Sequence, residues 1–182
     1  MRIRPAFIVL TYLLLFSCQK KEKEQRDIIQ AIQQTGKLVT VEYSLSKMVR
    51  ADDNKTWYKR GDRRILISTE AIVKAGVDLQ TIVPGDVSIS ENSISLRVPP
   101  PQVFSISIPP DKIKVLYEEV SFFRQRFSAA EREALLRQAE GQIRKLTDSL
   151  GILKTAQANA DLFLRKLLQQ GGYQNIDIRF EQ

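Results

Sequence analysis

The chain has 182 residues, a formal net charge of +7, one cysteine and no histidine. A chain of this length suits one domain with short appendages, and a hydrophobic content of 43% is enough for a packed core. The cysteine and histidine counts exclude a disulfide framework, thiolate-rich zinc sites and histidine-based catalytic triads. We therefore expect no cofactor, no metal site and no catalytic residue, and the sequence favours a role without catalysis.

The first predicted element is a secretory signal over residues 1–17. A basic start precedes an apolar run of about eleven residues, or roughly 16 Å as a helix, which is too short for a hydrocarbon core of about 30 Å. The run ends at Leu15-Phe16-Ser17-Cys18, which resembles the lipobox of bacterial lipoproteins. The resemblance implies that Cys18 is acylated and becomes the first mature residue. The alternative is a plain signal peptide or membrane segment in which Cys18 is incidental.

Residues 18–26 contain the mixed charges of KKEKE and are interpreted as a polar tether. A single domain is expected over residues 27–182. It starts with a short amphipathic helix at residues 27–35, and Gly36 is placed to end that helix as its C′ residue.

Alternating apolar residues then predict a series of strands joined by short turns. The predicted strands cover residues 37–49, 65–77, 87–90, 93–98 and 103–108. Pro99-Pro100-Pro101 and Pro109-Pro110 end two of them, because proline cannot donate a ladder hydrogen bond. Residues 112–120 fit either a further strand or the start of a helix. Short turns between the early strands favour antiparallel pairing.

The C-terminal third predicts two helices and a final strand at residues 173–180. Ser128 and Glu131 form a capping box for a helix over residues 129–149. A second helix is expected over residues 152–169, with a stripe at Leu153, Ala156, Ala160, Phe163 and Leu167. We expect this stripe to pack on the sheet, and an intermolecular seam is the alternative. The expected fold class is α+β: an antiparallel or mixed sheet covered by two C-terminal helices, with a final C-terminal strand.

The best candidate binding patch is a basic and aromatic segment between the first two long strands. Its basic residues are Lys55, Lys59, Arg60, Arg63 and Arg64, interleaved with Trp57 and Tyr58. Such a pattern suits phosphates, lipid headgroups or single-stranded nucleic acid, and export disfavours nucleic acid as the partner. The alternative is a solvated hairpin in which the two aromatic side chains pack inward.

Carboxylates supply the other candidate chemistry, although no catalytic motif is present. Glu70 and Lys74 form either a buried acid–base pair or opposite charges on the exposed face of a strand. Glu118 and Glu119 point opposite ways if their segment is a strand. An acidic pair about 5–9.5 Å apart in a cleft would indicate a glycan hydrolase.

Three stretches together resemble a known family: GDRRILISTEAIVKAGVDL (61–79), ISLRVPPPQVFSISI (94–108) and residues 139–180. The family is an uncharacterised bacterial domain of unknown function whose members often carry a membrane anchor or lipoprotein signal. The resemblance implies an envelope protein with an N-terminal anchor and brings no catalytic residues. A second likeness, to membrane scaffolds of the band-seven type, rests on the order of anchor, strands and helices alone.

We therefore expect an extracytoplasmic lipoprotein of the cell envelope, held at the membrane by an acyl anchor and acting as a non-enzymatic binding or scaffold module. Envelope proteins or anionic lipid are the expected partners. The alternatives are a carboxylate-dependent hydrolase of envelope glycans and a binder of anionic lipid or polyanions through residues 55–64.

Overall fold

The structure is a computed structural model that describes residues 25–54, 56–58 and 60–181. These residues form two compact units. The first combines the described residues up to Leu38 with Val77–Pro101 and the chain from Gln157 onward, and the second combines Val39–Gly76 with Gln102–Ala156. The expectation of a single domain over residues 27–182 stays a prediction, because these contacts do not test whether the units fold separately.

An antiparallel sheet forms the second unit. Its strands are β1 (Lys37–Asp53), β2 (Arg63–Asp78), β5 (Gln102–Ser107) and β6 (Ile113–Val120). Strand β1 lies beside β2, which also pairs antiparallel with β5 through residues 72–76 and with β6 through residues 63–69. The ambiguous segment 112–120 is therefore a strand, because it continues the ladder of β2.

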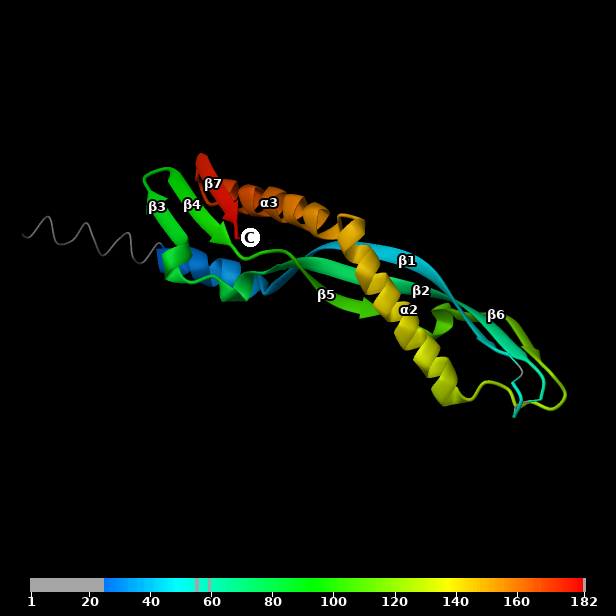
Figure 1. Cartoon of the computed structure of the whole chain (residues 1–182). Helices are drawn as coiled ribbons and strands as arrows, with labels where there is room; N and C mark the ends of the chain where they lie inside the picture. The colour runs from blue at the N-terminus through cyan, green and yellow to red at the C-terminus, as the bar shows by residue number, and fades with distance from the viewer. Residues whose placement is uncertain (1–24, 55, 59, 182) are drawn as a thin grey trace, which may run out of the picture. The chain divides into compact units, whose positions relative to one another are not determined.

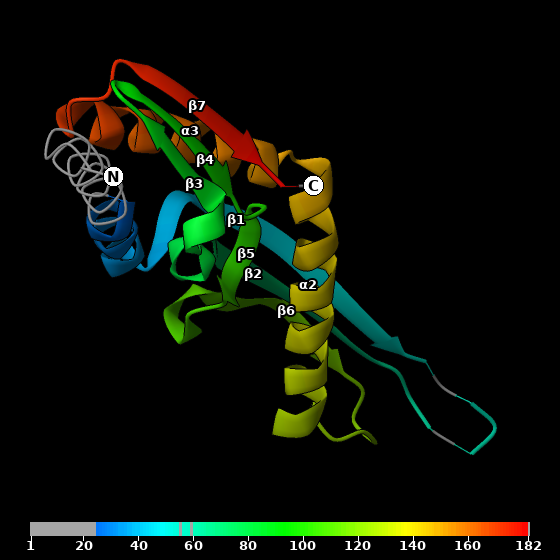
Figure 2. The ribbon, with the colours of Figure 1, turned by 90° about the vertical axis from the view of Figure 1, so that its left-hand side faces the viewer.

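Helix α2 (Ala129–Ser149) lies across one face of β1 and β2 (Figure 2). Every second residue of β2 from Ile65 to Ala75 is buried, so one face of the strand is a buried surface that is apolar except at Thr69. Leu135, Ala139 and Ile143 of α2 pack on that surface. The predicted capping box is present: the amide of Glu131 donates to the Ser128 hydroxyl at 3.3 Å, and the Glu131 carboxylate accepts from the Ser128 amide at 2.8 Å.

The first unit contains a second, smaller sheet of β3 (Val87–Ser90), β4 (Ser93–Val98) and β7 (Asn175–Phe180). β3 and β4 form an antiparallel hairpin, while β7 pairs with β4 in parallel. The parallel pair needs a long connection, which includes α3 (Ile152–Gln170). Short 3-10 turns occupy Leu79–Thr81, Pro84–Asp86 and Pro110–Lys112.

A helix over residues 25–35 completes the core of the first unit. Its Ile29 and Ile32 cluster with Leu164 and Leu168 of α3 and with the inward side chains of the smaller sheet. Its first described residues, Gln25 and Arg26, belong to the expected tether, and the Gln25 side-chain amide donates to the carbonyls of Pro84 and Val87. The helix ends at Gly36, whose φ of +68° fits the predicted C′ residue.

The predicted apolar stripe of α3 is correct at Ala156 and Ala160, only partly buried at Leu153 and Leu167, and wrong at Phe163. The buried residues are Ile152, Ala156, Ala160, Leu164 and Leu168, whereas Phe163 is 40% exposed. A spacing of four residues keeps the buried side chains together, and Phe163 lies about 100° away around the helix. The α+β class, the two C-terminal helices and the final strand are confirmed. No helix in the described part of the chain is long and apolar enough to cross a bilayer.

Candidate functional site

Two loops meet at one end of the antiparallel sheet (Figure 1). One is the β1–β2 connection, residues 54–62, and the other is the segment 121–127 between β6 and α2. The amide of Asp62 donates to the Ser121 hydroxyl at 3.0 Å, and the amide of Ser121 donates to the Asp62 carbonyl at 2.9 Å. Gly61 has a φ of +85°, and a Cβ there would lie 2.6 Å from the Ser121 Cβ, so glycine permits this contact. We call the described residues of these two loops the tip.

A cluster of charges holds the base of the tip. The Arg63 guanidinium donates to Asp53 at 3.0 Å and to both carboxylate oxygens of Glu131 at 3.2 and 2.5 Å. Arg124 also pairs with Asp53. The guanidinium of Arg63 lies 4.4 Å from the ring centroid of Phe127. We call Asp53, Arg63, Arg124 and Glu131 the brace, because they connect β1, β2, the second loop and α2.

The pKa of Glu131 reports the strength of this arrangement. Hydrogen bonds from the Arg63 side chain, followed by those from Ser128, lower this pKa from 4.5 to about 2. Glu131 therefore stays ionised well below neutral pH and keeps both of its roles, in the brace and in the helix cap.

The tip exposes four aromatic side chains. Trp57 and Phe122 are 96% and 94% exposed, and Tyr58 and Phe123 are also exposed. Within each loop the two rings meet edge to face, with centroids 5.4 Å apart for Trp57 and Tyr58 and 5.3 Å apart for Phe122 and Phe123. The alternative in which Trp57 and Tyr58 pack inward is therefore wrong. Large apolar side chains gathered at the surface are typical of an interaction site.

The five predicted basic residues have different positions. Lys55 and Lys59 lie outside the described residues. Arg60 is exposed on the tip and makes no ion pair with any described residue. Arg64 lies on the outer side of β2, 3.7 Å from Asp52 and 3.9 Å from Glu119. Arg63 is only 14% exposed and belongs to the brace, so the structure gives it a positioning role.

The second loop supplies residues that the sequence reasoning missed. Phe122, Phe123 and Arg126 are exposed beside the predicted patch, and Arg126 forms no ion pair with the described residues. The signal was present in the sequence FFRQRF, which interleaves aromatic and basic residues as residues 55–60 do. A pocket of about 370 Å³ opens on this loop and is lined by Glu118, Val120, Ser121, Phe122, Arg124 and Arg126.

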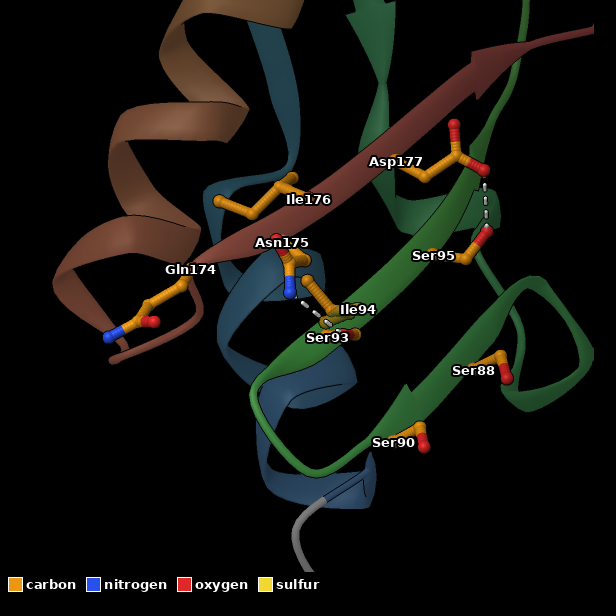
Figure 3. Close-up of a pocket in the computed structure, with 9 residues that line it drawn as sticks. All are labelled: Ser88, Ser90, Ser93, Ile94, Ser95, Gln174, Asn175, Ile176 and Asp177. Carbon is orange, nitrogen blue, oxygen red and sulfur yellow. Dashed lines mark hydrogen bonds between the residues drawn. The ribbon is translucent and has the colours of Figure 1, made fainter.

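A second pocket, of about 480 Å³, lies on the outer face of the smaller sheet (Figure 3). Serines of β3 and β4 line it together with Gln174, Asn175 and Asp177. The Ser95 hydroxyl donates to Asp177 at 3.3 Å, and the Asn175 amide donates to the Ser93 hydroxyl at 3.4 Å. These groups can hydrogen-bond a hydroxyl-rich ligand. Asp177 is the one carboxylate among the lining residues, and Arg179 lies 2.8 Å from it.

The remaining carboxylates have separate partners. Glu70 binds Lys112 at 3.3 Å, and Lys74 binds Glu42 at 3.2 Å, so Glu70 and Lys74 do not form an acid–base pair. Glu118 accepts from Arg132 at 3.0 and 3.1 Å. Neither pocket described above is lined by two carboxylates, and the described residues contain no group of three acidic or thiol ligands for a metal.

Comparison with known proteins identifies a family for this chain. Residues 30–178 match the model of a family described as "Protein of unknown function (DUF4230)". No curated protein and no solved structure gives a significant match. The match covers most of the chain and includes α2, α3 and both sheets except the last two residues of β7. The expectation of an uncharacterised domain family is thus confirmed, and the chain belongs to the DUF4230 family.

Proposed function

We propose that this protein is a membrane-tethered, non-enzymatic module of the bacterial cell envelope whose tip binds an anionic lipid surface. The lipobox-like sequence that ends at Cys18 supports the tether, and this segment lies outside the described residues. An acyl anchor keeps the tip near the membrane, so that even a weak contact is made at a high effective concentration. In this role the contact orients the second unit against the lipid.

The observation that carries the proposal is the near-complete exposure of Trp57 and Phe122 on loops that the brace holds in place. Tryptophan and other aromatic side chains favour the interface between headgroups and acyl chains. Burying one such side chain contributes about 1.5–3 kcal/mol. The two rings are displayed by loops that are fixed at their base, so little further ordering is needed on binding.

The positive charge of the two loops favours an anionic lipid surface over an uncharged apolar partner. The two loops contain five basic residues and one acidic residue: Lys55, Lys59, Arg60, Arg124 and Arg126 against Asp62. Each basic residue that reaches an anionic surface contributes about 1 kcal/mol. The hydrolase alternative has less support, because it needs two carboxylates in one cleft.

The test is sedimentation with vesicles of phosphatidylcholine and phosphatidylglycerol. Residues 19–182 suffice for it, because every residue of the three hydrophobic clusters lies within them. Changing Trp57 and Phe122 to serine should weaken binding by at least about tenfold, since the lost burial exceeds about 1.4 kcal/mol.

Phe163→Ser is the matched control, because it removes an exposed aromatic ring from α3 rather than from the tip. This control should bind as the wild type does. Circular dichroism establishes that each variant is folded. Equal binding by the wild type and the double tip variant would refute the proposal.

A further inference from the structure

We propose that the pocket beside Phe122 is a phosphate site, so that the tip prefers phospholipid headgroups to other anionic lipids of equal charge. This inference rests on the proposed function and adds the chemistry that the tip recognises.

Three side chains that line the pocket, all from one loop, carry hydrogen-bond donors: Ser121, Arg124 and Arg126. Arg126 makes no ion pair with the described residues, so its whole guanidinium fork is available. The Ser121 oxygen accepts from the Asp62 amide, which leaves the hydroxyl hydrogen able to donate. Arg124 pairs with Asp53 through one terminal nitrogen, while its other terminal nitrogen, Nη1, is buried with no hydrogen-bond partner in the described structure.

Two acidic residues near these donors, Glu118 and Asp53, are already paired with arginines. Glu118 lines the pocket, and both of its carboxylate oxygens accept from Arg132. Asp53 lies between Arg63 and Arg124 and is bound by both. The positive charge of Arg126 is therefore left to attract an anion.

A phosphate group fits this arrangement better than a carboxylate does. In a lipid phosphodiester the two non-bridging oxygens have enough lone pairs to accept from an arginine fork and from a hydroxyl at the same time, and the tetrahedral phosphorus directs an ester oxygen to another side, where it can face Arg124. Phe122 lines the same pocket and is almost fully exposed. A headgroup phosphate in the pocket would thus place the attached glycerol and acyl chains next to this ring.

The test compares two anionic lipids in vesicles of digalactosyldiacylglycerol, a neutral background without phosphate. One series contains phosphatidylglycerol, and the other contains the carboxylate lipid dioleoylglycerol hemisuccinate, at equal measured surface charge. The wild-type protein, residues 19–182, should bind the phosphatidylglycerol vesicles at least about fivefold more tightly, a ratio typical of one added charge-assisted contact.

Two variants separate phosphate recognition from simple charge. Arg126→Ala should reduce the ratio of the two affinities to about one. Arg60→Ala removes an equal charge from the tip outside the pocket, so it should weaken both affinities and keep their ratio. Both arginines are exposed, and both variants are expected to fold as the wild type does.

Three results would contradict the phosphate site. A wild-type affinity ratio near one would mean that the tip responds to charge alone. The same would follow from a ratio that persists in Arg126→Ala, or from a ratio that Arg60→Ala lowers as much as Arg126→Ala does. Those results leave the proposed function standing. Failure to bind either kind of vesicle would instead refute the proposed function, and the phosphate site with it.

Discussion

Removing Arg63 should destabilise the second unit more than removing any exposed arginine of the tip. Arg63→Ala deletes charge-assisted hydrogen bonds to Asp53 and Glu131 and the contact with the Phe127 ring. Such bonds contribute about 1.5–3 kcal/mol each when buried. Glu131 is 42% exposed, so we discount its bond to about 1 kcal/mol. The cation–π contact with Phe127 adds about 0.5–1 kcal/mol. Arg63→Ala should therefore lower the free energy of unfolding by about 3 kcal/mol in total.

Denaturant unfolding followed by far-ultraviolet circular dichroism measures this loss. Trp57, the single tryptophan, is exposed in the folded protein and is therefore a poor reporter of unfolding. Arg60→Ala is the control and should change the free energy of unfolding by less than about 0.5 kcal/mol. Arg63→Lys keeps the charge but loses the paired hydrogen bonds, so its free energy of unfolding should lie between those of Arg63→Ala and Arg60→Ala. If Arg63→Ala and Arg60→Ala were equally stable, the brace would not hold the tip.

Three further predictions follow from the core, the brace and the anchor. Leu164→Ala should lower the free energy of unfolding by about 3–4 kcal/mol and Phe163→Ala by less than about 1 kcal/mol, because Leu164 is fully buried and Phe163 is not. Thermal melting measures both changes, and equal losses would contradict the observed phase of α3. The folded pKa of Glu131 lies below its ordinary value, so its contribution is complete above about pH 4.5 and is lost as pH falls through about 2. The stability gap between the wild type and Glu131→Gln, discounted for exposure to about 1 kcal/mol, should therefore shrink over that range, and a constant gap would contradict the assignment. Cys18→Ser in the full chain should abolish labelling by a fatty-acid analogue, whereas equal labelling of both proteins would exclude the acyl anchor.

Local patterns predicted the features that depend on neighbouring residues. The Ser128 and Glu131 capping box is set within one helical turn, and the sequence places the start of α2 correctly. The alternation of β2 also places its buried side chains correctly. That same alternation could have shown that Arg63 points inward, because it shares the phase of Ile65, whereas Arg64 points outward.

Features that depend on distant pairing could not be predicted in this way. The tip exists because Ser121 bonds with Asp62, 59 residues earlier, and this contact follows from the pairing of β2 with β6. Short apolar runs do not specify their strand partners, so the parallel pairing of β4 with β7 could not be predicted either. The phase of α3 was misjudged at Phe163, because a large aromatic residue next to the true stripe also fits a spacing of three and four.

Fluorescence of Trp57 in the presence of anionic vesicles tests the central claim most directly, because this residue is the only tryptophan and lies on the tip. If the tip enters the lipid interface, the emission should shift to shorter wavelength as phosphatidylglycerol is added, and lipids with brominated acyl chains should quench it. The shift should diminish as salt is raised, since the surface charge is then screened. Protein that sediments with the vesicles while its Trp57 emission stays unshifted and unquenched would contradict the claim that the tip is the membrane-binding surface.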